Sequence, residues 1–81
     1  MQREMAQRNS VGAVPKADLV VMNPTHFAVA IRYDEASMGA PRVISKGADL
    51  LAMKIRDVAK QHSIPVLQSP MLARALRGVR T

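Results

Sequence analysis

Two apolar segments of this chain lie only four residues apart, and one of the residues between them is a proline. The first segment, residues 19–22, is a continuous apolar run, which is typical of a strand buried on both faces. The second, residues 27–33, alternates at period two and has the clearest strand pattern in the sequence. Because proline has no N–H to donate to a sheet, the first strand must end at Asn23 or lie at an edge. We therefore predict two strands separated by a turn at residues 23–26.

The rest of the chain predicts one more hairpin strand and a helix. Residues 34–40 have the composition of a loop, short enough for an antiparallel hairpin with a strand at residues 41–45. Residues 48–62 repeat apolar side chains at spacings of three and four, which predicts an amphipathic helix. Asp49 suits the positive end of the dipole of this helix.

A fourth strand is predicted at residues 66–68, and Ser69 with Pro70 then forms a typical helix start, with Gly78 as its stop. A strand, a helix and a strand in that order require a right-handed parallel crossover. The predicted fold class is α/β: a small mixed sheet of about four strands flanked by helices, in the order β-β-β-α-β-α. We expect a linker or partly helical arm at 1–17, a folded domain at 18–78 and a tail at 79–81.

Length and composition exclude several classes of protein. The 81 residues make one domain at most, with too little buried surface for a large enclosed substrate pocket. The absence of cysteine excludes disulfides and thiolate metal sites, and two histidines argue against zinc. No apolar stretch approaches the roughly 20 residues of a membrane-spanning helix, so we expect a soluble chain. We expect no cofactor and no bound metal.

The net charge of +6 invites a nucleic-acid interpretation, but its distribution argues against it. Residues 1–17, 18–69 and 70–81 carry +2, +1 and +3, so the surplus lies at the two ends. A domain that binds nucleic acid usually concentrates basic side chains on one folded face and adds aromatic side chains for stacking. Phe27 and Tyr33 are the only aromatic residues here. A non-cleaving basic module that binds nucleic acid or anionic lipid stays open as the alternative function.

The Asn-Pro pair at 23–24 carries a specific chemistry. Ordinary deamidation starts when the next residue's N–H attacks the asparagine side chain, and Pro24 has none. The remaining route has the Asn23 amide nitrogen attack its own main-chain carbonyl, which closes a succinimide and cuts the chain before Pro24. His26 could shuttle the proton, and the Thr25 hydroxyl could stabilise the oxyanion or brace the turn. The competing interpretation is a plain turn, with Asn23 bonded to backbone groups and His26 on the surface.

The tetrapeptide and its surroundings resemble the cytoplasmic domains of a known family. The resemblance rests on residues 14–21, the tetrapeptide itself, residues 27–34, Met38-Gly39-Ala40-Pro41 and Lys46-Gly47-Ala48-Asp49. Together they resemble the FlhB, YscU, EscU and SpaS family of self-cleaving export-switch proteins in type III secretion. The match covers roughly residues 14–76, and two of its features look more flagellar than injectisome-like: Tyr33-Asp34 and the Lys-Gly-Ala-Asp stretch.

The resemblance implies a function, partners and a location. It implies one autocatalytic cut between Asn23 and Pro24, supported by Thr25 and His26, after which both pieces stay associated. The protein would then be a single-turnover switch in substrate specificity rather than an enzyme with turnover. Exported rod- and hook-type substrates and the hook-length control protein would dock on an apolar surface that includes Ala40 and Pro41, although a strand-entry turn also explains that pair. Its other partners would be export-apparatus proteins and its own cleaved N-terminal fragment, with no nucleic acid.

The resemblance also places the domain at the cytoplasmic face of the bacterial inner membrane, with the arm at 1–17 leading from a membrane domain. Some features depart from the family pattern. Arg77 stands where an aromatic is usual and Met71 where a second proline is common. The family's further helical segment after Thr81 and its four membrane helices are not in this sequence. We therefore expect either an excised cytoplasmic domain or a short standalone homologue.

Overall fold

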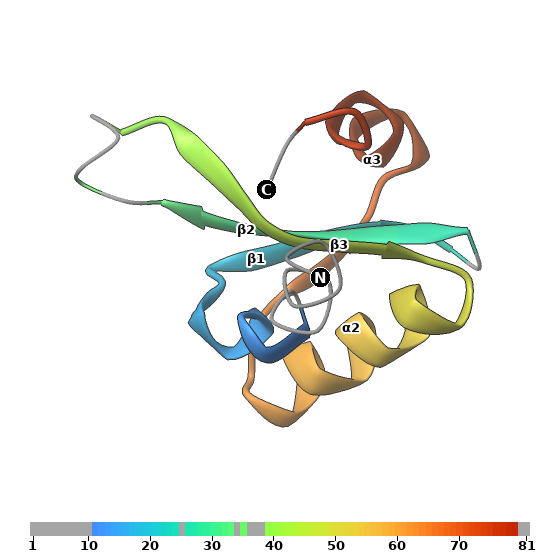
Figure 1. Ribbon diagram of the computed structural model, residues 1–81, viewed down its shortest axis with the longest axis horizontal. Coiled ribbons are helices and arrows are strands. Elements are labelled where there is room, and N and C mark those ends of the chain that lie inside the picture. Colours follow the sequence, from blue (N-terminus) through green and yellow to red (C-terminus); the bar gives the residue numbers. More distant parts are fainter. Residues whose placement is uncertain (1–10, 25, 34, 36–38, 80–81) are drawn as a thin grey trace, which may run out of the picture.

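A computed structural model describes residues 11–79 apart from 25, 34 and 36–38. Its elements follow one another as η1 (Val14–Lys16), β1 (Leu19–Asn23), β2 (Phe27–Tyr33), β3 (Pro41–Ala48), α2 (Leu50–Gln61), β4 (Val66–Gln68) and α3 (Pro70–Leu76). The four strands form one mixed sheet flanked by helices, which confirms the predicted fold class (Figure 1).

The sheet has the strand order β3-β2-β1-β4. β2 pairs antiparallel with both β1 and β3, whereas β4 pairs parallel with β1. β3 and β4 therefore run in the same direction at opposite edges, and α2 makes the parallel crossover between them. β1 buries Val20 and Met22 on one face and Val21 on the other, which explains why its sequence is apolar without alternation.

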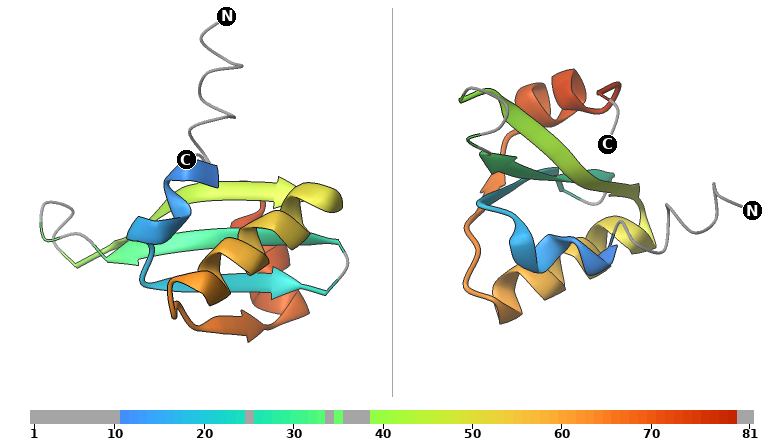
Figure 2. Two further views of the ribbon diagram at one scale, coloured as in Figure 1. Left: turned by 90° about the horizontal axis from the view of Figure 1, so that it is seen from below. Right: turned by 60° about the vertical axis from the view of Figure 1, so that its left-hand side comes forward.

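The sheet is covered on both faces. α2 and η1 lie on one face and α3 lies on the other, as the two further views also show (Figure 2). The face toward α2 buries Val20, Met22, Ala28 and Ala30 against Ala52, Ile55 and Ala59. The face toward α3 buries Val21, Phe27, Val29, Ile31 and Val43 against Ala73. The alternation in β2 therefore separates two cores, with the larger side chains under α3.

β3 and α2 meet at a different place from the one that the sequence predicts. β3 continues to Ala48 instead of ending at residue 45, and α2 begins at Leu50 instead of residue 48. The reason is tertiary: Ala48 pairs with Phe27 in the ladder, so backbone pairing with β2 outweighs the helical spacing of its side chain. A register shift between Ala30 and Ile31 absorbs one extra residue of β3.

The ends of the helices follow the sequence more closely. Ser69 is the N-cap of α3 and its hydroxyl oxygen accepts a hydrogen bond from the Leu72 N–H at 3.4 Å. The described part of the N-terminal arm packs on the domain: Val14 in η1 is fully buried and η1 contacts α2. The packed unit therefore includes residues that precede β1. None of the helices in the described ranges has the length and apolar character needed to cross a membrane.

Candidate functional site

The Asn-Pro-Thr-His tetrapeptide forms the turn between the two central strands. Asn23 is the last residue of β1 and lies opposite Phe27, the first residue of β2. The main-chain N–H of His26 donates to the main-chain carbonyl oxygen of Asn23 at 2.9 Å and closes the turn. Asn23 and Pro24 are half-buried and His26 is exposed, whereas Thr25 lies outside the described residues. The structure thus brings Asn23, Pro24 and His26 into one turn.

Proline favours this turn for two reasons. Its fixed φ suits the second position of a four-residue turn. Its ring also pushes the preceding residue toward extended conformations, which agrees with the position of Asn23 in β1. The local sequence and the sheet therefore demand the same backbone shape at Asn23.

The hydrogen bond that closes the turn has a chemical consequence. The carbonyl of Asn23 belongs to the peptide bond between Asn23 and Pro24. A donor on its oxygen polarises the carbonyl and stabilises negative charge that develops there when a nucleophile attacks the carbon. The turn therefore presents a backbone N–H to the group that asparagine cyclisation would attack.

Hydrogen bonds to other elements hold both sides of the turn. The Ser69 N–H donates to the carbonyl oxygen of Met22 at 3.0 Å, which links the end of β1 to the start of α3. The Asp49 N–H donates to the carbonyl oxygen of His26 at 2.8 Å, which links the start of β2 to the junction between β3 and α2. The turn is therefore fixed to elements far away in the sequence.

Comparison with known proteins identifies the family of this chain. A family model described as the FlhB HrpN YscU SpaS Family matches residues 1–79. The chain belongs to this family. It is 54% identical over 76 residues to the flagellar biosynthetic protein FlhB of Salmonella typhimurium, which covers 94% of this chain and 20% of that protein. The FlhB of Bacillus subtilis is 52% identical over 75 residues, which covers 93% of this chain and 21% of that protein. The chain thus spans about a fifth of the length of these relatives.

Solved structures of FlhB and EscU domains share the fold. The crystal structure of the cytoplasmic domain of FlhB from Shewanella putrefaciens matches with a TM-score of 0.80 and 46% identity, covering 88% of this chain and 54% of that one. A crystal structure of the EscU C-terminal domain with an asparagine-to-alanine mutation matches with a TM-score of 0.79 and 30% identity. It covers 88% of this chain and 72% of that one. Another EscU structure, with the adjacent proline mutated to alanine, matches equally well and covers 71% of that chain.

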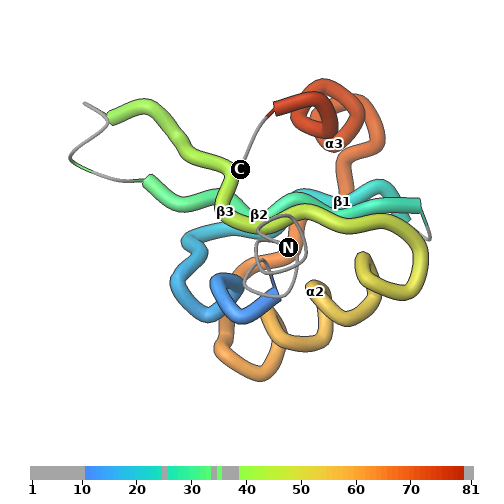
Figure 3. Tube along the Cα trace, viewed as in Figure 1, coloured from blue at the N-terminus to red at the C-terminus, as the bar shows by residue number. Residues whose placement is uncertain are grey.

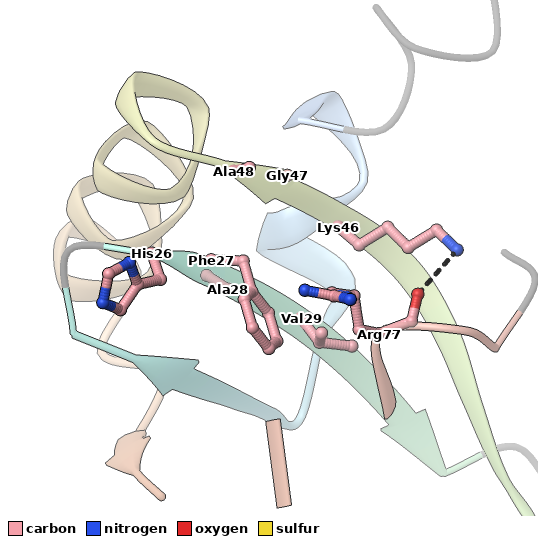
Figure 4. Close-up of a pocket in the computed structure, with 8 residues that line it drawn as sticks. All are labelled: His26, Phe27, Ala28, Val29, Lys46, Gly47, Ala48 and Arg77. Carbon is pink, nitrogen blue, oxygen red and sulfur yellow. Dashed lines mark hydrogen bonds between the residues drawn. The ribbon is translucent and has the colours of Figure 1, made fainter. Parts of the chain in front are cut away.

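A hollow of about 390 Å³ opens beside the turn, between the start of β2 and the end of β3 (Figure 4). Its floor includes the buried Phe27, and the guanidinium carbon of Arg77 lies 5.5 Å from the centre of that ring. The Lys46 ammonium donates to the carbonyl oxygens of Arg77 at 3.3 Å and Val79 at 2.6 Å. These contacts tie the segment after α3 to β3 and place two positive charges at the edge of an apolar hollow.

Ala40 and Pro41, the second pair that the resemblance singles out, lie far from the turn. Both are exposed. Pro41 pairs with Tyr33, the last residue of β2, whereas Phe27 is the first residue of that strand. Seven strand residues place the two ends of β2 roughly 20 Å apart. This end of the β2–β3 hairpin projects beyond both helices (Figure 3). The two candidate sites are therefore separate surfaces of one hairpin.

The sequence did not single out the contribution of Asp49 to the turn. Asp49 contacts the turn through its main-chain N–H, and its side chain makes no cap hydrogen bond to α2. The sequence pointed to Asp49 only as a residue that suits the helix dipole and as part of the Lys-Gly-Ala-Asp stretch that resembles the family.

Among residues 11–79 with the gaps given above, no group of three or more His, Cys, Asp or Glu side chains lies close enough to hold a metal ion.

Proposed function

We propose that this chain is a self-cleaving docking and switching domain of a type III protein-export apparatus, and that the bond between Asn23 and Pro24 is cut. Family membership supports the export role. The observation that carries the cut is the hydrogen bond from the His26 N–H to the carbonyl oxygen of Asn23, at 2.9 Å. It places a donor on the carbonyl that must become the electrophile.

The cut proceeds by cyclisation of Asn23. The side-chain amide nitrogen attacks the main-chain carbonyl carbon of the same residue, and a new C–N bond closes a five-membered ring. The bond to the Pro24 nitrogen breaks, and the proton that the amide nitrogen loses is transferred to the departing Pro24 nitrogen. The products are a C-terminal succinimide on residues 1–23 and a free amino terminus at Pro24. Water later opens the succinimide.

An amide is a weak nucleophile, so orientation and charge stabilisation must supply the rate. Fixing the reacting groups in a near-attack geometry lowers such barriers by roughly 7–11 kcal/mol at best. The sheet and Pro24 orient Asn23, and the His26 N–H stabilises the oxyanion. The exposed His26 imidazole and the Thr25 hydroxyl are the side chains nearest in sequence that can relay the proton. Asn23 is consumed, so the chain reacts once.

The two pieces stay together after the cut. β1 ends at Asn23, lies between β2 and β4, and buries Val20 and Val21 completely. The ladder bonds and the bond from Ser69 to Met22 all connect β1 to residues on the other piece. The cut therefore frees the turn at His26 and leaves the core intact. This is suited to a change of surface rather than to release of a product.

The freed turn borders the hollow over Phe27, and the exposed Ala40 and Pro41 provide a second surface at the far end of the hairpin. We assign to Ala40 and Pro41 the docking of exported rod- and hook-type substrates and of the hook-length control protein. The domain would act at the cytoplasmic face of the inner membrane, joined through residues 1–17 to a membrane domain of the longer protein. The cut changes which substrates the apparatus accepts.

A time course of the purified chain at neutral pH tests this proposal. Denaturing electrophoresis should show the parent chain converting into fragments 1–23 and 24–81. Asn23→Ala should stay intact, whereas Asn9→Ala, which changes the other asparagine of the sequence, should cleave like the parent. If Asn23→Ala cleaves at the parental rate, the cyclisation mechanism is wrong.

Binding measurements test the alternative function, a basic module for nucleic acid or anionic lipid. Tight and strongly salt-dependent binding of DNA, RNA or anionic vesicles by an intact chain would favour that alternative. The export proposal predicts weak binding to these ligands at physiological ionic strength.

A further inference from the structure

Asp49 has a backbone conformation that residues other than glycine rarely adopt. Its φ is 54° and its ψ is −119°, at the junction of β3 and α2. Ser63, with a φ of 57°, is the other non-glycine residue with positive φ among those that the structure describes. Such a conformation costs free energy and persists only where the surroundings hold it in place.

The contacts that hold Asp49 involve its backbone. Its N–H donates to the carbonyl oxygen of His26 at 2.8 Å, and its carbonyl oxygen accepts from the Met53 N–H at 3.2 Å at the start of α2. Its side chain makes no cap hydrogen bond to the helix. The backbone at this junction packs closely against α2: a Cβ on Gly47 would collide with the side chain of Leu51.

Both main-chain polar groups of His26 are hydrogen-bonded. Its carbonyl oxygen is bound by Asp49, and its N–H is bound to the carbonyl oxygen of Asn23, at 2.8 and 2.9 Å. A displacement of Asp49 would release the His26 carbonyl. It would then allow the His26 N–H to leave the carbonyl that is attacked.

We propose that Asp49 is a positioning residue for cleavage between Asn23 and Pro24. Its main-chain N–H fixes the backbone of His26 and, through it, the hydrogen bond on the carbonyl oxygen of Asn23. This inference rests on the proposed self-cleavage. The strained conformation of Asp49 is retained because it directs the N–H at His26, and the carboxylate is not the acting group.

Replacing the peptide N–H by an ester oxygen tests this directly, and a chain of this size is accessible by chemical ligation. Putting an α-hydroxy acid with the same side chain at position 49 removes the donor and keeps the side chain. The matched control is the same change at Ser63, whose N–H donates to the Lys60 carbonyl oxygen at 3.2 Å near the other end of α2. The control shares the positive φ and the loss of a backbone bond, but it has no contact with the turn.

The ester at 49 should slow cleavage roughly tenfold, less than the roughly 10²–10³-fold loss expected when an oxyanion donor itself is removed. The ester at 63 should leave the rate within about twofold, with a similar loss of thermal stability. Equal cleavage rates for the two folded esters would overturn the inference.

Amide hydrogen exchange separates this inference from the proposed function. In the Asn23→Ala background, which removes the cyclising group, the ester at 49 should speed exchange of the His26 amide roughly tenfold, whereas the ester at 63 should not. If the parent chain never cleaves but His26 exchange responds as expected, the proposed cleavage fails and the positioning contact stands. If His26 exchange is unchanged, the positioning contact itself is wrong.

Ordinary substitutions give a second readout. Asp49→Gly keeps the N–H and accepts positive φ, so its cleavage rate should stay within about twofold of the parent rate. Asp49→Val keeps the N–H, but its branched side chain resists this conformation, so cleavage should slow. Ser63→Gly and Ser63→Val control for stability. Slow cleavage by a folded Asp49→Gly variant would assign the role to the carboxylate and overturn the inference.

Discussion

The main-chain N–H of His26 lies 2.9 Å from the main-chain carbonyl oxygen of Asn23, and this one contact both closes a turn and polarises the carbonyl next to Pro24. Many tight turns contain such a bond without reacting. Here the acceptor belongs to an asparagine followed by a proline, which leaves cyclisation onto this carbonyl as the open route. The geometry of an ordinary hairpin turn therefore coincides with that of a developing oxyanion site.

Replacing Asn23 by alanine should abolish cleavage and leave the fold in place. The contacts that hold the turn at this residue are main-chain bonds, which alanine keeps. We expect the free energy of unfolding of Asn23→Ala to lie within about 1 kcal/mol of the uncut parent value. Chemical denaturation checks this. A variant that fails to fold would show that Asn23 is a structural residue.

Gly47→Ala should destabilise the domain by roughly 1–3 kcal/mol, because the new Cβ would overlap the side chain of Leu51. The matched control is Gly12→Ala, where a Cβ meets nothing within 4 Å. Thermal unfolding of both variants checks the prediction. Equal stabilities would mean that the junction before α2 can relax, and that the close approach of Gly47 and Leu51 is not required.

Arg77→Ala should cost about 0.5–1 kcal/mol, because its guanidinium lies 5.5 Å from the centre of the Phe27 ring and helps to hold the end of α3 over the sheet. Arg74→Ala, in the last turn of α3 and also exposed, serves as the comparison. Loss of stability in the Arg77 variant alone would support the ring contact. An equal loss in both variants would point to the helix dipole instead, since both side chains lie near its C-terminal end.

Pro41→Ala should weaken binding of exported substrates while leaving the fold and the cut intact. Pro41 is exposed at the far end of the hairpin and lies roughly 20 Å from the turn. A loss of about 1 kcal/mol, or roughly fivefold in affinity, is typical for an interface residue that matters. Calorimetry with an exported hook-type protein measures it, and Lys54→Ala on the exposed side of α2 is the control. Unchanged affinity would remove Pro41 from the docking surface.

Fragments 1–23 and 24–81 should remain in one complex after cleavage. β1 gives up three buried side chains, Val20, Val21 and Met22, if it leaves the sheet, and exposing each costs roughly 1.5–3 kcal/mol. Size-exclusion chromatography of cleaved protein in native buffer should give one peak that contains both fragments. Separation of the fragments without denaturant would contradict the proposal that the cut changes a surface and keeps the core.

The sequence predicted the strands around the turn well because local and tertiary preferences agree there. Pro24 favours an extended Asn23, and the alternation from Phe27 to Ile31 matches a strand between two cores. The prediction that the helix begins at Ala48 was wrong, because the side chain of Ala48 has helical spacing while its backbone pairs with Phe27. The role of the Asp49 backbone was hidden for a related reason. The main-chain hydrogen bond between residues 26 and 49 does not depend on the identity of either side chain, so the sequence does not reveal it.

The mass of the N-terminal fragment tests the central claim most directly. Purified chain, denatured at intervals during incubation at neutral pH, is measured intact by mass spectrometry. Cyclisation predicts fragments 24–81 and 1–23, with the early 1–23 fragment one water lighter than the free acid because it ends in a succinimide. A single intact species after long incubation would contradict the claim that this chain cleaves itself.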